Sequence, residues 1–214
     1  MIDNLFKLKD IKFKNILDIE NLEINENVVT IVKGESGSGK STMLKLLNNI
    51  ISPNSGVVMY NGVDVNDINP ITLRREVIMQ SQFPNIFPGN VRENLNIIFT
   101  LRGEEGLDDE KLLKALEIVN LKKDLTDDAQ NLSGGEKTRL SIARLFLVVP
   151  EVFLLDEPGA SLDSKTEEIL MNNVISEIKR RNKTLIYISH SENQESISDE
   201  IITMKDGRVI SHER

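Results

Sequence analysis

The sequence predicts an α/β domain with a mainly parallel sheet, an N-terminal antiparallel β region and an inserted helical subdomain. Short apolar runs alternate with helical patterns from position 149 onward, which is typical of β–α–β units in a parallel sheet. Period-two alternation of apolar and polar residues over the first thirty residues indicates antiparallel strands. The segment 88–127 is charged, follows a helical period and contains no clear strand, so we expect it to form the insertion.

The composition excludes several classes of function. The chain has 214 residues, with 26 Lys plus Arg against 34 Asp plus Glu, and the net charge of −8 argues against a nucleic-acid binder. It has no cysteine and only two histidines, which excludes disulfides and thiol catalysis and argues against a histidine-built metal centre. The most apolar run, Leu145–Leu155, is too short to span a bilayer. We therefore expect a cytoplasmic protein without direct membrane insertion.

The elements are expected to form one domain over 1–214. The core is expected over approximately 1–87 and 128–214, and the helical subdomain over approximately 88–127 plus the helix that follows residue 132. The first half is expected to hold the early strand pair, a buried strand over Asn27–Gly34, a helix over Gly39–Ile50 and a hairpin turn at Tyr60–Gly62. The second half is expected to hold a strand at 151–157, a helix at 165–181, a strand at 184–190 and a closing hairpin at 200–210.

A phosphate-binding loop is predicted at Gly34–Ser41. The segment reads GESGSGKS and fits the pattern G-x-x-x-x-G-K-[ST] between an expected buried strand and an expected helix. Glycines let phosphate oxygens approach backbone N–H groups, Lys40 can reach the β- and γ-phosphates, and Ser41 can ligate Mg²⁺. A chance match in a chain of this length has a frequency on the order of 1%. Nucleotide binding is therefore the stronger interpretation.

Two further strand ends carry candidate catalytic groups. Parallel strands end at the edge where ligands bind in α/β folds, so Asp156 can hold Mg²⁺ and Glu157 can act as a general base toward water. Taken alone, such a strand end is more often an ordinary loop entry. His190 ends the next apolar strand. A lone histidine there is usually structural, but beside a phosphate loop it can donate to the γ-phosphate.

The segment Leu132–Arg144, LSGGEKTRLSIAR, reads as a capped helix start. Ser133 can cap the helix, and Glu136 three residues later completes a capping box. A capping box needs no glycine, yet Gly134 and Gly135 occupy the first turn, where each costs about 1 kcal/mol relative to alanine. The pair indicates that some group must come close to this backbone.

Together these motifs resemble the ATP-binding cassette of the ABC ATPases. The family's motifs follow its order over essentially the whole chain: the phosphate loop, a glutamine in MQSQFPNIF, then LSGGE, VFLLDEP, GASLD and ISH. The combination of a phosphate loop and an LSGGE signature is specific to this family. The chain is also similar to small stand-alone bacterial subunits, including those paired with proposed exporters of metals such as iron.

The resemblance implies a role for each matching residue. Gln82 would be the Q-loop glutamine, Asp163 the D-loop aspartate and His190 the switch histidine. Phe13 would stack on adenine, although a buried strand residue is an equal alternative. The residues implied to bind ATP are Gly34, Glu35, Ser36, Gly37, Ser38, Gly39, Lys40, Ser41, Thr42, Phe13, Ser133, Gly135, Glu136 and Asp163. Those implied in catalysis are Glu157, His190, Lys40 and Gln82, and those implied to bind Mg²⁺ are Ser41, Gln82 and Asp156.

The resemblance also implies the assembly. Two copies would pair head to tail around two ATP molecules, so that Ser133 and Gly135 of one copy act on the γ-phosphate held by the other. The paired glycines would then give clearance for that phosphate, and one copy alone would be nearly inert. The dimer would drive a separate transmembrane permease at the cytoplasmic face of the cell membrane. A soluble ABC ATPase for iron–sulfur cofactor assembly shares every motif and stays open as the alternative.

A few positions depart from the family pattern. Glu136 stands where glutamine is commonest, and the other departures are Asn90, Gly159, Ser161 and Ser191. None of them removes a catalytic group, so the resemblance implies a competent ATPase.

Overall fold

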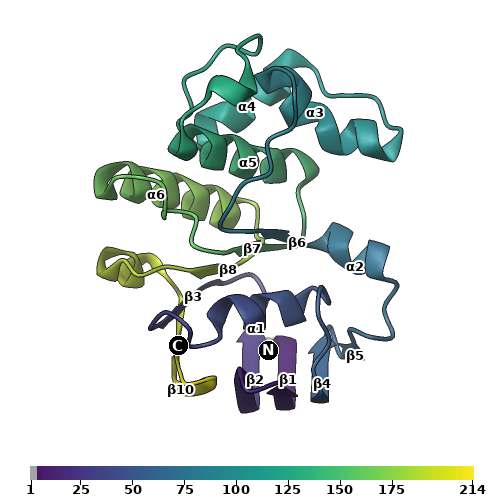
Figure 1. Ribbon diagram of the computed structural model, residues 1–214, viewed down its shortest axis with the longest axis vertical. Helices are drawn as coiled ribbons and strands as arrows, with labels where there is room; N and C mark the ends of the chain where they lie inside the picture. The colour runs from purple at the N-terminus through teal and green to yellow at the C-terminus, as the bar shows by residue number, and fades with distance from the viewer. Residues whose placement is uncertain (1–3) are drawn as a thin grey trace.

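A six-stranded sheet forms the centre of the molecule, which the computed structural model describes over residues 4–214, apart from the side chains at 192 and 193. Its strand order is β10-β9-β3-β8-β7-β6 (Figure 1). All neighbours are parallel except β9 and β10, which form an antiparallel hairpin at one edge. The strands are β3 (Val29–Gly34), β6 (Val77–Gln80), β7 (Val152–Leu155), β8 (Thr184–Ile188), β9 (Glu200–Lys205) and β10 (Arg208–Glu213). The predicted mainly parallel sheet is confirmed.

A second, antiparallel sheet of four strands has the order β2-β1-β4-β5. Its strands are β1 (Asn4–Phe13), β2 (Leu17–Asn25), β4 (Ser55–Tyr60) and β5 (Val63–Asp64). Between β4 and β5, Asn61 and Gly62 have φ angles of 49° and 77°. Positive φ at both central residues is what a two-residue type I′ hairpin turn needs. The antiparallel β region and its Asn-Gly turn were predicted, and both are confirmed.

Helix α1 (Lys40–Leu47) lies between the two sheets (Figure 1). Its apolar side chains are fully buried in a core that includes residues of both sheets, and they are Met43, Leu44, Leu46 and Leu47. The predicted helix was too long at its end. Asn49 has a left-handed φ of 51°, which interrupts the helix, and Ile50 is 51% exposed instead of continuing the apolar stripe.

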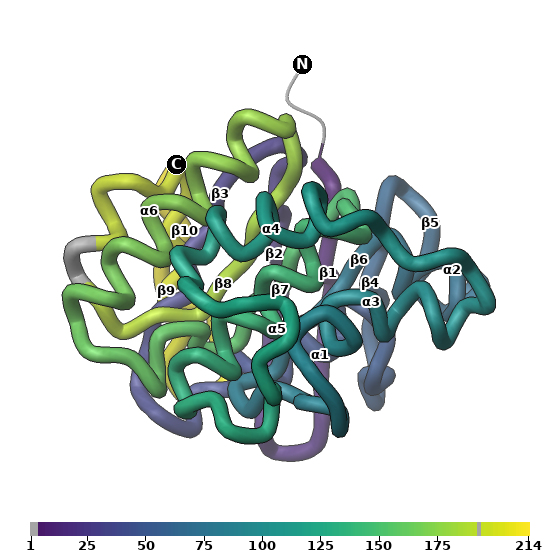
Figure 2. The backbone as a smooth tube through the Cα atoms, turned by 90° about the horizontal axis from the view of Figure 1, so that it is seen from above, coloured from purple at the N-terminus to yellow at the C-terminus, as the bar shows by residue number. Residues whose placement is uncertain are grey.

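Helices cover the other face of the six-stranded sheet. Alternation along β7 separates the two cores, because Phe153 and Leu155 join the core of the helices whereas Val152 and Leu154 join the core around α1. The helices on this side are α6 (Ser164–Arg180) and a group of three, α3 (Val91–Arg102), α4 (Asp109–Ile118) and α5 (Gly134–Val148). The group of three lies at one end of the molecule, beyond α6 in Figure 1, and these helices therefore lie in front of the sheet in Figure 2, which is seen from above.

Four short elements complete the chain. Helix α2 (Pro70–Glu76) leads into β6 and had no counterpart among the predicted elements, and neither did β6 itself. The 3₁₀ turns η1 (Ala129–Asn131) and η2 (Glu192–Ile197) precede α5 and β9. Strand β6 lies at the edge of the six-stranded sheet, and the next element along the chain is α3. The segment between them therefore links the sheet to the group of three helices.

Candidate active site

Three sequence motifs meet at one edge of the six-stranded sheet. Residue Val32 of β3 pairs with Ile188 of β8, and Leu155 of β7 pairs with Tyr187 of β8. Because these strands are parallel, their carboxyl ends lie side by side. The phosphate loop after β3, the carboxylates after β7 and His190 after β8 are thus brought together.

The phosphate loop needs its glycines for two different reasons. Gly34, Gly37 and Gly39 have φ angles of 142°, 81° and 99°, which only glycine adopts readily. A Cβ on Gly34 would lie 2.1 Å from the Met204 carbonyl oxygen, so the backbones pack too closely for a side chain. At Gly37 a Cβ would meet no atom of the described chain within 4 Å, so this part of the loop faces open space where a ligand can approach.

The Lys40 ammonium lies folded within the loop. Its Nζ donates to the carbonyl oxygens of Gly34 and Glu35, both at 2.8 Å. Burial lowers the pKa of Lys40, and the charges of Glu157 and Asp156 oppose that shift. Lys40 also begins α1, directly after Gly39, so the first N–H groups of the helix point into the loop. A positive charge beside free N–H groups fits the phosphates of a nucleotide.

Ser41 and Asp156 form the second half of the site. The Ser41 hydroxyl donates to Asp156 Oδ1 at 2.8 Å. Burial raises the pKa of Asp156, while the hydrogen bond from Ser41 acts in the opposite direction. Over residues 4–214, no group of three or more His, Asp or Glu side chains could hold a metal ion by itself. A hydroxyl and one carboxylate fit Mg²⁺, which usually takes few protein ligands and completes its shell with phosphates and water.

Glu157 is held from two sides. Gln82 Nε2 donates to Glu157 Oε2 at 2.7 Å, and His190 Nε2 lies 3.3 Å from Glu157 Oε1. The backbone of Glu157 has a φ of 49°, a conformation that is costly for a non-glycine residue and is concentrated at functional sites. Gln80, the other glutamine of the motif, is buried and accepts a hydrogen bond from Ser141 of α5. The structure therefore brings Gln82, and not Gln80, to the carboxylate.

The LSGGE segment starts α5 in the way its sequence predicts. The Ser133 N–H donates to Glu136 Oε2 at 2.9 Å and the Glu136 N–H donates to Ser133 Oγ at 3.3 Å, so the predicted capping box is confirmed. The backbone hydrogen bond from Ser133 holds the pKa of Glu136 below its usual value, and Lys123 at 3.1 Å adds to the effect. In the described part of the chain, no hydrogen bond or ion pair joins Ser133–Glu136 to the phosphate loop of the same copy.

The two glycines of this segment are not equivalent. A Cβ on Gly135 would lie 2.5 Å from Leu162 Cδ2 and 3.1 Å from the Ser161 carbonyl oxygen, whereas a Cβ on Gly134 would meet its nearest neighbour, Ser161 Cβ, at 3.7 Å. Neither has a positive φ. The absence of a side chain at Gly135 therefore lets the loop after β7 pack closely on α5 within one copy, whereas Gly134 has no such close neighbour.

This difference gives a paired prediction on stability. Gly134→Ala should raise the free energy of unfolding by about 0.5–1 kcal/mol, because alanine favours the helix and meets only ordinary contacts. Gly135→Ala should lose that gain, because the new methyl group displaces Leu162. Urea unfolding of both variants without nucleotide measures the difference. Equal stabilisation by both substitutions would contradict the packing role of Gly135.

Two residues of the predicted site, Asp163 and Phe13, make their contacts with other parts of the chain. Asp163 caps α6, accepting hydrogen bonds from the Thr166 N–H at 3.0 Å and the Thr166 hydroxyl at 2.6 Å, and these bonds lower its pKa. Phe13 is half-buried against the core around α1, with Lys14 Nζ 5.2 Å from its ring centre. Neither residue has a hydrogen bond or ion pair with the phosphate loop within the described chain. Stacking of Phe13 on adenine stays a prediction.

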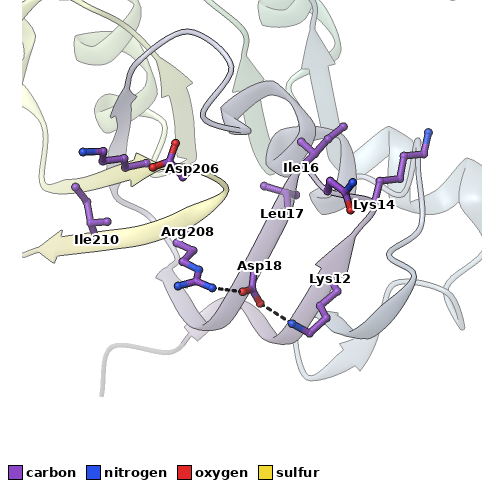
Figure 3. Close-up of a pocket in the computed structure, with 10 residues that line it drawn as sticks. Lys12, Lys14, Ile16, Leu17, Asp18, Asp206, Arg208 and Ile210 are labelled. Carbon is purple, nitrogen blue, oxygen red and sulfur yellow. Dashed lines mark hydrogen bonds and ion pairs between the residues drawn. The ribbon is translucent and has the colours of Figure 1, made fainter.

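The turn after Phe13 reaches the phosphate loop through Ile16 and Leu17. A Cβ on Gly39 would lie 2.5 Å from Leu17 Cδ2 and 3.2 Å from the Ile16 carbonyl oxygen. Ile16 and Leu17 also line a pocket between this turn and the β9–β10 hairpin, together with Asp206 and Arg208 (Figure 3). Ile16 and Leu17 were not predicted as site residues, because no local sequence pattern shows which turn between strands will lie beside the phosphate loop.

A glycine-rich loop between a strand and a helix, with an aspartate and a glutamate at the end of another parallel strand of the same sheet, defines a nucleotide-binding α/β domain of the P-loop class. The family is specified by comparison with known proteins. The family model described as ABC transporter matches residues 17–160. The chain belongs to this family, as an ATP-binding cassette of the ATPase type.

Individual relatives agree with this assignment. The lactococcin-A transport/processing ATP-binding protein LcnC of Lactococcus lactis is 34% identical over 92% of the chain, and the chain spans only 28% of that protein's length. ABC transporter I family member 17 of Arabidopsis thaliana is also 34% identical, over 91% of the chain and 74% of that protein. Among solved structures, MJ0796 in a dimeric post-hydrolysis state with ADP and Pi has a TM-score of 0.82 at 28% identity, with 98% of both chains covered.

Proposed function

We propose that the chain binds ATP with Mg²⁺ and hydrolyses it at the edge of the sheet where its three motifs meet. The observation that carries this proposal is Glu157, which follows β7 and is held between Gln82 and His190 at the same sheet edge as the phosphate loop. A carboxylate in that place can take a proton from an attacking water. The relative MJ0796, solved with ADP and Pi, supports the class of substrate.

Each remaining side chain of the site has a task in this reaction. Lys40 would turn from the loop carbonyls toward the β- and γ-phosphates, and His190 would donate to the γ-phosphate. Ser41 and Asp156, which already contact each other, would hold Mg²⁺. The metal, when bound, neutralises charge that develops on the phosphates. Gln82 would orient the water or complete the metal shell.

The second half of the active site would come from another copy of the chain. Ser133, Gly135, Glu136 and Asp163 have no hydrogen bond or ion pair with the phosphate loop of their own copy in the described residues, which supports an action in trans. The helix N-terminus at Ser133 offers N–H groups to a phosphate. The relative MJ0796 was solved as a dimer. The proposed assembly is therefore a head-to-tail homodimer around two ATP.

The cycle of dimer closure and opening would drive a membrane permease at the cytoplasmic face of the cell membrane. Relatives of the chain are described as transport ATP-binding proteins, which favours transport over cofactor assembly. Phe83 and Leu101, on the loop after β6 and on α3, are 79% and 73% exposed and provide apolar contacts for such a partner. Leu101 belongs to the helical subdomain that we propose over about 88–127 plus α5, and Phe83 lies on the segment that leads into it. None of the helices described over 4–214 combines the length and the apolar character that crossing a membrane requires.

The assembly predicts how activity depends on protein concentration. Because a complete site needs two copies, the rate of ATP hydrolysis per chain should rise with concentration and level off once dimers dominate. The measurement is phosphate release with saturating ATP and Mg²⁺ over a wide dilution series. A rate per chain that stays constant down to dilutions at which only monomer is seen would show that one copy suffices, and the trans model would be wrong.

A further inference from the structure

Glu167 has no assigned role, yet it lies against both loops that carry the Glu157–His190 pair. It sits in the first turn of α6, one turn after Asp163. The pocket beside the catalytic carboxylate is lined by Glu157, His190 and Glu167 together. The 17-residue helix α6 packs on the sheet through a buried apolar face, so it offers a fixed base for whatever Glu167 contacts.

On one side, Glu167 fixes the turn that holds the histidine. Its Oε1 accepts hydrogen bonds from Gln194 Nε2 at 3.0 Å and from the Ser189 hydroxyl at 3.5 Å. The Ser189 oxygen in turn accepts from the Ser191 N–H at 3.1 Å. Ser189 and Ser191 flank His190, so this chain of contacts sets where the imidazole stands. Gln194 is 2% exposed, so its contact with Glu167 is shielded from water.

On the other side, Glu167 fills the place of a side chain in the loop after β7. A Cβ on Gly159 would lie 2.2 Å from Glu167 Cδ and 2.3 Å from Oε1. Gly159 does not have a positive φ, so its backbone conformation does not require glycine. The reason for glycine here is the space that a side chain would otherwise take. Gly159 is also one of the departures from the family pattern noted above, where threonine is commoner. The loop that begins at Glu157 thus rests directly on the Glu167 carboxylate.

We propose that Glu167 is a positioning residue for the Glu157–His190 pair, and that Gly159 is a glycine so that this carboxylate can reach it. The proposal rests on the proposed hydrolytic function, because it assigns Glu167 to the geometry of that reaction. Glu167 makes no hydrogen bond or ion pair with the phosphate loop among the described contacts. Its loss should therefore slow hydrolysis and leave ATP binding unchanged.

The first test compares three variants of the full chain. Glu167→Ala should lower kcat about tenfold with KM unchanged, because it removes an orienting contact and no binding contact. Glu167→Gln keeps an acceptor oxygen for Gln194 and Ser189, so its kcat should stay within about twofold of the wild type. The matched control is Glu168→Ala, the exposed neighbour on the same helix, which should behave as the wild type. Equal kcat values for Glu167→Ala and the wild type would overturn the proposal.

Gly159 provides a second and independent test. Gly159→Ala should displace the end of the flexible Glu167 side chain and reproduce the loss in kcat seen for Glu167→Ala. In the Glu167→Ala background, the same substitution should cost nothing further, because the space is already empty. Additive losses from the two substitutions would mean that they act separately, and would contradict the proposal.

A readout without hydrolysis separates this proposal from the proposed function. The chain has only two histidines, so the ring signals of His190 and His212 can be assigned by NMR in isotope-labelled protein. Glu167→Ala and Gly159→Ala should shift the His190 signals and leave those of His212 unchanged. If wild-type protein hydrolyses no ATP but these shifts occur, the proposed function fails and the positioning role stands. If the His190 signals do not move in either variant, the positioning role is wrong, whatever the activity.

Discussion

The Glu157→Gln variant is expected to bind ATP normally and to hydrolyse it at least about a hundredfold more slowly, the loss that removal of a general base produces. The amide keeps the shape of the carboxylate and can still accept from Gln82, which donates at 2.7 Å in the wild type. It cannot take a proton from water. Phosphate release under saturating ATP and Mg²⁺ measures the loss, and equilibrium binding of ATP confirms that affinity is kept.

The same variant should accumulate as a dimer when ATP and Mg²⁺ are present. If ATP joins the phosphate loop of one copy to Ser133 and Gly135 of the other, a protein that does not cleave ATP stays closed. Size exclusion with and without ATP should then show dimer and monomer, respectively. Glu168→Gln is the matched control, because it makes the same change of charge at an exposed position on α6. If Glu157→Gln elutes only as monomer with ATP and Mg²⁺, the head-to-tail model loses its main support.

Features of the fold that depend on neighbouring residues were predictable from the sequence. The capping box of Ser133 and Glu136 and the turn at Asn61-Gly62 are formed by residues within a few positions of one another. Alternation along β7 also follows from a local pattern, since each strand presents its two faces to different cores. The weak elements α2 and β6 were missed because they have only seven and four residues. Asn69 before Pro70 was the one local sign of α2, and it caps that helix through its side chain.

Features of the site that depend on distant residues were not predictable. Gly135 was interpreted as clearance for a bound phosphate, which stays a prediction, and the structure adds a contact that the sequence does not show: a Cβ there would lie 2.5 Å from Leu162 Cδ2, in a loop 27 positions further along the chain. Glu167 gave no signal at all, because its partners Gly159, Ser189 and Gln194 come from three segments that only the folded sheet brings together. The choice of Gln82 over Gln80 depended on the resemblance, and the structure adds its physical basis, the contact with Glu157.

The Lys40→Ala variant is expected to lose at least about thirtyfold in ATP affinity, since truncating one partner of a buried charge pair costs about 2–5 kcal/mol and 1.4 kcal/mol corresponds to a factor of ten. The ammonium stands at the start of α1 and now satisfies two loop carbonyls at 2.8 Å. Burial lowers the pKa of Lys40, so the folded protein bears a desolvation cost for this charge. A nucleotide phosphate would offset this desolvation cost by pairing its negative charge with the ammonium.

The desolvation cost of the Lys40 ammonium also predicts that Lys40→Ala stays folded. A loss of ATP binding can then be told apart from a loss of folding. Without nucleotide, Lys40→Ala should have a thermal unfolding midpoint close to that of the wild type. The substitution loses two hydrogen bonds to loop carbonyls, but it also removes a desolvated charge, and the carbonyls can accept hydrogen bonds from water instead. At the same ATP concentration, ATP should raise the midpoint of the wild type much more than that of the variant, because stabilisation of the folded state follows the affinity for the ligand. Lys9→Ala removes the same charge from an exposed position on β1 and should respond to ATP like the wild type. ATP stabilisation of Lys40→Ala equal to that of Lys9→Ala would show that the nucleotide phosphates bind elsewhere than at Gly34–Ser41.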